Sequence, residues 1–274
     1  MTNCYQDPEY LRHNQYRDSA NLEARAALHR RFSTGKLDWF DWVWQKLALQ
    51  PGEQRVLECG CGPGGLWAYN RARLPANCSV VLTDLSAGMV AEAREILGDL
   101  PRFRFETADI QQLPFPDNSF DVVVANHMLY HVPHLDQALA EVKRVLRSDE
   151  NSSRPNARLV CATNGDNHMR ELPELAQAHN FPLHFRSQQL AFRLENGEAL
   201  LRPFFSQIER HDYDSNLAVT EVAPLLAYAL SYGEARQQIT PDQLDLLRQH
   251  VASVIADQGY FHITKATGLF VASV

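Results

Sequence analysis

A glycine-rich turn directly after a short apolar strand constrains this chain more than any other feature. Residues 56–65 read VLECGCGPGG, so an apolar run ends in an acid and glycines follow at 60, 62, 64 and 65. Glycine lets the backbone turn with positive φ and leaves no Cβ between the main chain and a ligand. A helix that begins on such a turn offers free N–H groups and the positive end of its dipole. The pattern predicts a strand–turn–helix unit that holds a nucleotide-like ligand.

The acid at the end of the strand, Glu58, separates two interpretations of these glycines. A carboxylate at this point would repel a pyrophosphate and attract a cation. Gly60, Gly62 and Gly65 satisfy the G-x-G-x-x-G pattern of dinucleotide-binding proteins, so an NAD(P)-dependent oxidoreductase remains an alternative. The charge of Glu58 favours a ligand that carries positive charge instead.

Apolar strands alternate with helices through the middle of the chain. This alternation is typical of βαβ units and predicts an α/β fold with a mostly parallel sheet that helices cover on both faces. The fourth strand is nearly all valine, as expected of a strand buried on both sides. The expected strands are 55–58, 79–82, 103–106, 121–125 and 158–163, and the expected helices are 64–73, 86–97 and 135–146.

The two ends of the chain have a different pattern. The first fifty residues are helical in pattern and rich in aromatic residues, and residues 164–205 are mixed helix and loop without a clear strand. After them we expect a strand over 208–213, helices over 221–231 and 241–255, and one long final strand over 261–271 that contains Gly268. We interpret residues 1–274 as a single domain with four parts: a helical cap (1–51), a ligand-binding core (52–163), a lid or substrate insertion (164–205) and closing strands and helices (206–274).

Composition excludes several classes of function. Hydrophobic residues make up 45% and charged residues 22% of the chain, and no apolar run approaches the roughly 20 residues that span a bilayer. The N-terminus lacks the basic and apolar regions of a secretory signal, so we expect a cytoplasmic protein without a membrane partner. The net charge of −7 makes a nucleic-acid partner unlikely, because such binding depends on neutralising phosphates.

The five cysteines predict neither a disulfide framework nor a metal site. Their number is odd and the chain is long, which argues against disulfides. Cys59 and Cys61 form a C-x-C pair, but no second Cys/His pair stands at ligand spacing, so we expect no metal. We expect both side chains to fill small spaces beside the glycine turn.

Two acids follow the second and third expected strands. Ligands of open α/β sheets bind outside the carboxyl ends of the strands. Asp84 stands at such an end and can accept both hydroxyls of a ribose, although a helix N-cap or a turn aspartate explains it as well. Asp109 and Ile110 suit an adenine, because the acid can accept from the exocyclic amine while Ile110 packs on the ring; a surface turn is the alternative.

The fourth strand runs into the polar and aromatic segment 126–131, NHMLYH. This places Asn126, His127 and His131 at the carboxyl edge of the sheet. Either histidine is a candidate general base, because imidazole titrates near neutral pH. The chain has 11 histidines, so a structural or exposed histidine is the competing interpretation.

The order of glycine turn, Asp84, Asp109 and the segment FDVVVANHMLYHVP resembles the class I S-adenosylmethionine-dependent methyltransferases. The resemblance covers roughly residues 55–163, and Glu58-x-Gly60-x-Gly62-x-Gly64 fits that family's first motif. It implies a Rossmann-like, seven-stranded, mostly parallel sheet with an antiparallel last strand, and S-adenosylmethionine as cofactor. The cofactor carries a sulfonium and an ammonium and no phosphate, which agrees with an acid at Glu58.

The resemblance also implies roles for particular positions. Glu58 and the glycine turn would meet the methionine part, Asp84 the ribose, and Asn126 the region of the sulfonium. The cofactor-binding residues implied in this way are Glu58, Gly60, Cys61, Gly62, Gly64, Asp84, Leu85, Met89, Asp109, Ile110, Asn126 and His127.

Methyl transfer is an in-line displacement at an activated carbon, so positioning and desolvation matter more than a strict catalytic base. The candidate catalytic residues are His131, His127 and Tyr16, and we expect an N-terminal tyrosine such as Tyr16 to lie over the methyl group. Tyr5 and Tyr10 are other N-terminal candidates. Trp39 and Trp42 are expected near the pocket as well, and of the four aromatic residues between 39 and 44 only some can face one pocket on a helix. The expected lining from the insertion is His168, Met169, Phe181, His184, Phe185 and Phe192.

A small-molecule acceptor is the favoured substrate, with its nucleophilic atom open. Enzymes that methylate exocyclic amines of bases carry a Pro-Pro-aromatic motif where this chain has Asn126-His127-Met128. This departure and the acidic charge argue against base modification. An RNA or protein methyltransferase remains the alternative, and a non-catalytic cofactor-binding module is a more remote one. The sequence leaves the oligomeric state open, a homodimer included.

Overall fold

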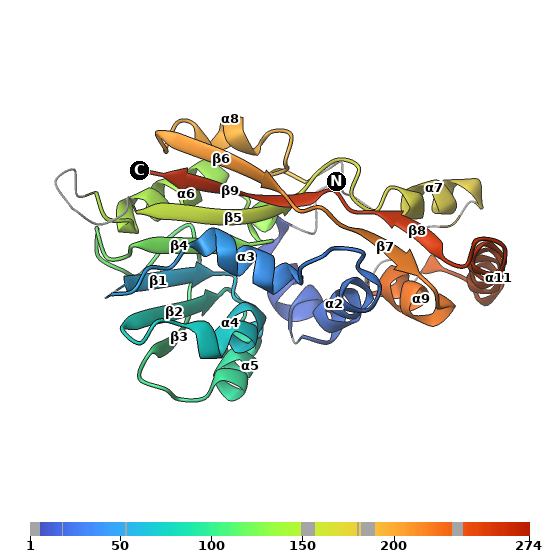
Figure 1. The fold of residues 1–274 in the computed structure, drawn as a ribbon, viewed down its shortest axis with the longest axis horizontal. Coiled ribbons are helices and arrows are strands. Elements are labelled where there is room, and N and C mark those ends of the chain that lie inside the picture. Colours follow the sequence, from blue (N-terminus) through green and yellow to red (C-terminus); the bar gives the residue numbers. More distant parts are fainter. Residues whose placement is uncertain are drawn as a thin grey trace.

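A seven-stranded sheet forms the main body of the protein in the computed structural model (Figure 1). The structure describes residues 6–17, 19–52, 54–148, 157–179, 181, 190–231 and 238–274. The strands follow the order β3-β2-β1-β4-β5-β9-β6, and β1 to β5 are mutually parallel. The bounds are β1 Gln54–Cys59, β2 Cys78–Asp84, β3 Phe103–Thr107, β4 Val122–Asn126, β5 Arg158–Asn164, β6 Gln207–Asp212 and β9 Thr267–Ser273.

The last strand, β9, is antiparallel to both of its neighbours, β5 and β6. The predicted α/β class, with a Rossmann-like seven-stranded sheet and an antiparallel last strand, is therefore confirmed. β4 and β5 lie in the middle of the sheet and are buried along nearly their whole length. This explains their continuous apolar sequences, because a central parallel strand has no face exposed to water.

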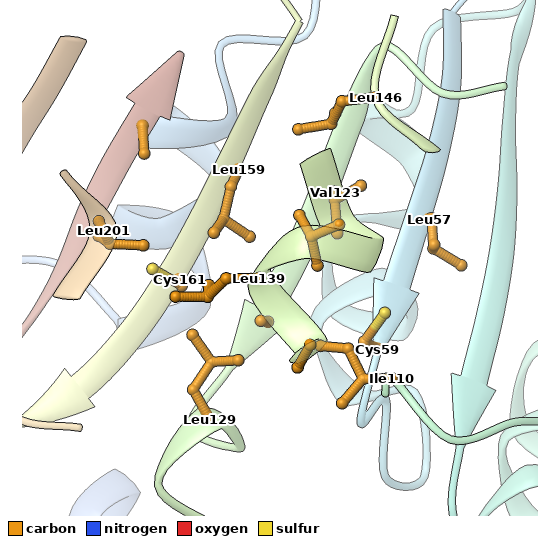
Figure 2. Close-up of a cluster of buried hydrophobic side chains, with 14 of the residues drawn as sticks. Leu57, Cys59, Ile110, Val123, Leu129, Leu139, Leu146, Leu159, Cys161 and Leu201 are labelled. Atoms are coloured by element: carbon orange, nitrogen blue, oxygen red, sulfur yellow. The ribbon is translucent and has the colours of Figure 1, made fainter. Parts of the chain in front are cut away.

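Helices cover both faces of this sheet. On one face, α3 (Trp39–Leu47), α4 (Gly65–Asn70) and α5 (Ala87–Leu97) bury their apolar sides together with residues of β1 and β2. On the other face, α6 (Leu135–Val145) and α8 (Gly197–Leu201) pack on the sheet around a second cluster of buried apolar side chains (Figure 2). Ser86 is the N-cap of α5 and accepts from the N–H of Met89.

A small lobe extends from the end of the main sheet (Figure 1). A third cluster of buried apolar side chains forms its core. Shorter elements complete the described chain: α1 (Pro8–Tyr10), a π-helical turn (Leu11–Gln15) and 3-10 turns at Arg71–Arg73 and Leu129–His131. The small lobe consists of β7 (Asn216–Val219) and β8 (Phe261–Thr264), which pair antiparallel, with α2 (Ala20–Phe32), α7 (Glu171–Ala178), α9 (Val222–Leu230) and α11 (Pro241–Gln258).

The predicted single strand over 261–271 is wrong. The chain forms β8 in the small lobe, leaves that ladder at Lys265 and Ala266, and then enters the main sheet as β9. At the break, the N–H of Lys265 donates to the side chain of Asn216, and the carbonyl of Ala266 accepts from Gly165. The prediction also missed β7, the partner of β8. The segment looks like one strand because buried apolar residues stand on both sides of Lys265, although in different sheets.

The described part of the chain contains no helix long and apolar enough to cross a membrane. Tyr5, His184 and Phe185, which the sequence placed near the ligand, lie outside the described residues.

Candidate active site

A cavity of about 460 Å³ lies where the carboxyl ends of the central strands meet α2 and the small lobe. Its floor comes from the residues that directly follow β1, β2, β4 and β5. α2, the N-terminal turn and the link between β8 and β9 supply the rest of its wall. The volume lies within the range of small-molecule and cofactor sites, and the position is the one where open α/β sheets bind ligands.

The glycine turn has the backbone geometry that the sequence predicted. Gly60, Gly62 and Gly64 all have positive φ, at 69°, 53° and 78°. A Cβ on Gly60 would lie 2.8 Å from the side chain of Met128, so space as well as conformation requires glycine there. Gly64 is the N-cap of α4, so the turn leads straight into that helix.

Glu58 is buried at the end of β1, with 2% of its surface exposed. The indole N–H of Trp67, on α4, donates to its Oε2 atom at 2.6 Å. Burial raises the pKa of Glu58 to about 8; the Trp67 hydrogen bond opposes this rise, and the charge of Asp84 adds to it. The carboxyl group borders the cavity, and a cation placed there would restore its ionised form.

Asp84 closes the glycine turn from the end of β2. Its Oδ2 atom accepts from the N–H of Gly62 at 3.0 Å, and its Oδ1 atom accepts from Ser86 at 2.8 Å. Burial raises the pKa of Asp84, and these backbone hydrogen bonds oppose the rise. Each carboxylate oxygen has two lone pairs, so each can accept one further bond from a ligand hydroxyl. The N-cap of α5 is Ser86, so the interpretation of Asp84 as that cap is wrong, whereas its bond from the N–H of Ser86 is that of a turn aspartate.

Asp109 and Ile110 follow β3 and border the same cavity. Asp109 accepts from the backbone N–H of Gln111 at 2.9 Å and from its side-chain amide. Ile110 belongs to the cluster of buried side chains beneath α6 that Figure 2 shows, and 5% of its surface is exposed. Other predicted cofactor-binding residues, from the glycine turn and the β2–α5 turn, line the cavity as well. They are Glu58, Gly60, Cys61, Gly62, Asp84, Leu85 and Met89.

Cys59 and Cys61 pack in different places. Cys59 belongs to the cluster beneath α6, and Cys61 belongs to the cluster on the opposite face of the sheet. Burial raises the pKa of the Cys59 thiol to about 12 and that of Cys61 well above its ordinary value. Both thiols are therefore neutral and fill space beside the turn, as predicted.

Asn126 and His127 extend from the end of β4. The Oδ1 atom of Asn126 is buried and has no hydrogen-bond partner among the described residues. His127 has a positive φ of 56°, and its ring lies 5.0 Å from that of Trp39. Burial, and secondarily the charge of Lys265, lower the pKa of His127 to about 4. His127 is therefore neutral at physiological pH and too weakly basic to serve well as a general base there.

Tyr16 and His131 are in contact at the wall of the cavity. Tyr16 directly follows the N-terminal π-helical turn, and His131 ends the 3-10 turn after β4. The hydroxyl of Tyr16 lies 2.9 Å from Nε2 of His131, and the two rings are edge to face at 5.4 Å. Tyr130 packs on the other side of His131, at 4.6 Å between ring centres. The structure thus brings together two of the three residues predicted to be catalytic.

Only some of the aromatic residues of α3 face the cavity. Trp39 lines it, as expected, together with Phe40. The expectation that Trp42 lies there is wrong, because Trp42 is buried in the core, and Trp44 packs near Trp67. In the insertion, His168 lines the cavity. Met169, Phe181 and Phe192 are core residues instead, because helix packing in the small lobe and on the sheet buries them. Tyr10 does not line the cavity.

Sequence reasoning missed several polar groups of the cavity, among them two from α2 and one from the final strands. His29 and Arg25 come from α2, and Lys265 comes from the break between β8 and β9. His29 lies in the helical cap, where only aromatic residues were predicted to contact the ligand. Lys265 lies inside the segment that was predicted as one long strand. A lysine within an otherwise apolar run was the one signal that could have marked this break.

Comparison with known proteins identifies the family. A family described as a methyltransferase domain matches residues 57–150. The chain is 30% identical over 212 residues to a malonyl-[acyl-carrier protein] O-methyltransferase of Geobacter sulfurreducens, a match that covers 76% of this chain and 74% of that enzyme. The chain belongs to the class I S-adenosylmethionine-dependent methyltransferases.

Other methyltransferases share parts of this sequence or its fold. A ubiquinone/menaquinone biosynthesis C-methyltransferase of Stenotrophomonas maltophilia is 37% identical over 112 residues, which is 40% of this chain and 44% of that enzyme. A phosphoethanolamine N-methyltransferase 2 of Haemonchus contortus, solved with S-adenosylhomocysteine, has the same fold at a TM-score of 0.58 and 20% identity, over 98% of this chain and 60% of that one.

The protein is therefore a methyltransferase enzyme, and its cofactor is S-adenosylmethionine. The oxidoreductase and the non-catalytic module do not fit this family. The relatives act at O, C and N atoms, so membership of the family leaves the acceptor open.

Proposed function

We propose that this methyltransferase acts on a small-molecule acceptor that binds in the cavity beside the cofactor. The observation that supports this most strongly is the junction of two sets of residues in one space of about 460 Å³. One set is the acidic edge of the sheet, with the glycine turn. The other is the histidines and tyrosines of α2, the N-terminal turn and the end of β4. None of these side chains requires a nucleic-acid base as the acceptor.

The described residues of the sheet edge fit the cofactor. Glu58 and Asp84 supply carboxylates where the cofactor presents an ammonium and ribose hydroxyls, and the unpartnered Oδ1 atom of Asn126 supplies a further acceptor. Asp109 and Ile110 stand where the adenine would lie. Gly60 and Gly62, both with positive φ, border the cavity and let the backbone approach without a Cβ, whereas a Cβ on Gly64 would meet Leu97 and Ala93 of α5. When bound, the cofactor supplies a methyl group on a cationic sulfur, which is already activated for displacement.

The Tyr16–His131 pair is the proposed proton-handling group. The acceptor must lose a proton if its nucleophilic atom arrives protonated, and His131 can take it directly or through the Tyr16 hydroxyl. His127 is a weaker candidate because burial keeps it neutral and of low basicity. We assign His127 to holding the acceptor by a hydrogen bond. The N-terminal turn and α2 would then close over the bound acceptor and exclude water.

The experiment is a transfer of labelled methyl groups. The protein is incubated with methyl-labelled S-adenosylmethionine and either the dialysable or the macromolecular fraction of a cell extract. We expect label in a small molecule of the dialysable fraction. Label confined to RNA or protein would support the alternative substrate class and overturn the proposal.

Variants then test the proton-handling group with the acceptor so identified. Tyr16→Phe and His131→Gln should lower kcat by about 10²-fold, the scale of lost acid–base catalysis, while the affinity for S-adenosylhomocysteine stays unchanged. Tyr260→Phe is the matched control, because Tyr260 is 43% exposed and does not line the cavity. An unchanged kcat in both Tyr16→Phe and His131→Gln would remove the pair from the mechanism.

A further inference from the structure

One wall of the cavity is basic, although the protein as a whole is acidic. His29 from α2, His168 from the loop after β5, and Lys265 from the break between β8 and β9 make up this wall, which we call the basic subsite. Three separate segments of the chain therefore converge on it. The family motif explains none of them, because all three lie outside residues 57–150, which match the methyltransferase domain.

Lys265 is half-buried and carries the charge of this subsite. Its Nζ atom lies 4.8 Å from the centre of the Tyr213 ring, and no hydrogen bond or ion pair joins it to any part of the chain that the structure describes. Burial lowers the pKa of Lys265 to about 8, and the charge of Asp38 opposes this effect. Asp38 is already engaged as the N-cap of α3, where it accepts from Phe40 at 2.8 Å.

The two histidines of the subsite are neutral and stacked. Their ring centres lie 5.9 Å apart, and the Nδ1 atom of each is buried with no partner within the described ranges. Burial is the main reason that the pKa of His168 falls to about 3 and that of His29 falls well below its ordinary value. The nearby charge of Lys265 lowers both further, as do the neighbouring His127 and, for His29, Arg25. A neutral imidazole keeps one N–H donor.

Charged side chains of both signs line the cavity. Glu58, Asp84 and Asp109 border the part that fits the cofactor, whereas Lys265 borders it at the break between β8 and β9, where Asp38 is the carboxylate that acts on its charge. Apart from the Tyr213 ring, the half-buried Lys265 ammonium has no hydrogen bond or ion pair within the described residues, and a bound group of opposite charge would lower the cost of its burial. The acceptor that binds in this cavity can supply such a group.

We propose that the methyl acceptor carries a carboxylate, which the Lys265 ammonium pairs with in the basic subsite while His29 donates a neutral N–H to it. This inference rests on the proposed function, because it concerns the acceptor of that reaction. A phosphate monoester carries about −1.5 to −2 charges and needs several donors or cations. The subsite itself holds one ammonium and two neutral imidazoles, with Arg25 as a further cation of the same cavity, and this set matches the single charge of a carboxylate better.

The test measures binding of simple probes to the protein saturated with S-adenosylhomocysteine. Benzoate is the carboxylate, benzamide is its uncharged counterpart, and phenyl phosphate is the phosphate monoester. Calorimetry gives each Kd. The chain has four lysines, at 36, 46, 143 and 265, so protein labelled with ¹³C-lysine lets the Cε signal of Lys265 be assigned with one variant and followed against pH.

We expect benzoate to bind at least about tenfold more tightly than benzamide and phenyl phosphate, and to raise the pKa of Lys265. Lys265→Met, which keeps the aliphatic stem, should lose that preference, whereas the exposed Lys36→Met should keep it. The variant's affinity for S-adenosylhomocysteine and its Tm show that it is folded.

Benzoate that binds no better than benzamide, or equally well to Lys265→Met, would overturn the proposal, as would tighter binding of phenyl phosphate. The proposed function fails in a different way, through absence of methyl transfer to any dialysable acceptor. The two failures are therefore distinguishable.

Discussion

Replacing Glu58 with Gln should make the cofactor-free protein more stable and the cofactor complex weaker. Glu58 is buried, and its pKa in the folded protein is about 8, against an ordinary value of 4.5. Because the folded pKa is the higher one, the ionised carboxyl opposes folding: stability is full below pH 4.5 and decreases as pH rises to about 8. At pH 7 the loss is about 3 kcal/mol, at roughly 1.4 kcal/mol for each pH unit above the ordinary pKa.

Glutamine removes this titration and can still accept from Trp67 through its amide oxygen. We therefore expect the free energy of unfolding of Glu58→Gln at pH 7 to exceed that of the wild type by about 3 kcal/mol, which corresponds to a rise in Tm of about 8 °C. The difference should vanish below pH 4.5. Thermal unfolding followed by circular dichroism across this pH range measures it. Glu95→Gln, at an exposed position of α5, is the matched control and should leave Tm unchanged.

The same variant should bind S-adenosylhomocysteine more weakly. Loss of a charged partner for the cofactor's ammonium costs about 2–3 kcal/mol, or about 30–150-fold in Kd. The measurement belongs above the Glu58 pKa of about 8, where the wild-type carboxyl is already ionised. A variant that is no more stable than the wild type at pH 7, or a Kd within threefold of the wild-type value, would refute the reasoning.

Three further predictions concern other parts of the site. Asp84→Ala should weaken S-adenosylhomocysteine binding by about 2–3 kcal/mol, because it removes hydrogen bonds to a charged group; a calorimetric Kd within twofold of wild type would contradict this. Gly60→Ala should lower stability by about 1–3 kcal/mol more than Gly98→Ala, since both have positive φ but only Gly60 would place a Cβ against Met128; equal Tm values would exclude the clash. The pKa of His127 is about 4 in the folded protein against an ordinary 6.5, so stability should decrease by about 3 kcal/mol as pH falls from 6.5 to 4. Acid unfolding curves of His127→Gln should lack this decrease.

Local constraints made the core of the site predictable from the sequence. The turn at Gly60, Gly62 and Gly64 needs positive φ, so glycine marks it in any context. Asp84 and Asn126 each end an apolar strand, and parallel strands bring their carboxyl ends to one edge. The position of these residues on the cavity therefore followed from their place in the pattern.

Contacts between distant segments were not predictable in the same way. The indole of Trp67 binds Glu58 because α4 folds back beside β1, and nothing in the strand's own sequence indicates that partner. Lys265 and His29 reach the cavity only because the small lobe packs against the main sheet. The apolar run around Lys265 hid the switch between two sheets, since burial on either side looks alike in sequence.

The most direct test of the central claim is a crystal structure of the protein with S-adenosylhomocysteine. In this complex we expect both ribose hydroxyls within hydrogen-bond distance of Asp84 and the adenine beside Asp109 and Ile110. We expect the sulfur to face the Tyr16–His131 pair across space left for an acceptor. A complex in which the ligand lies outside this cavity, or in which Asp84 bonds only to Gly62 and Ser86, would contradict the claim.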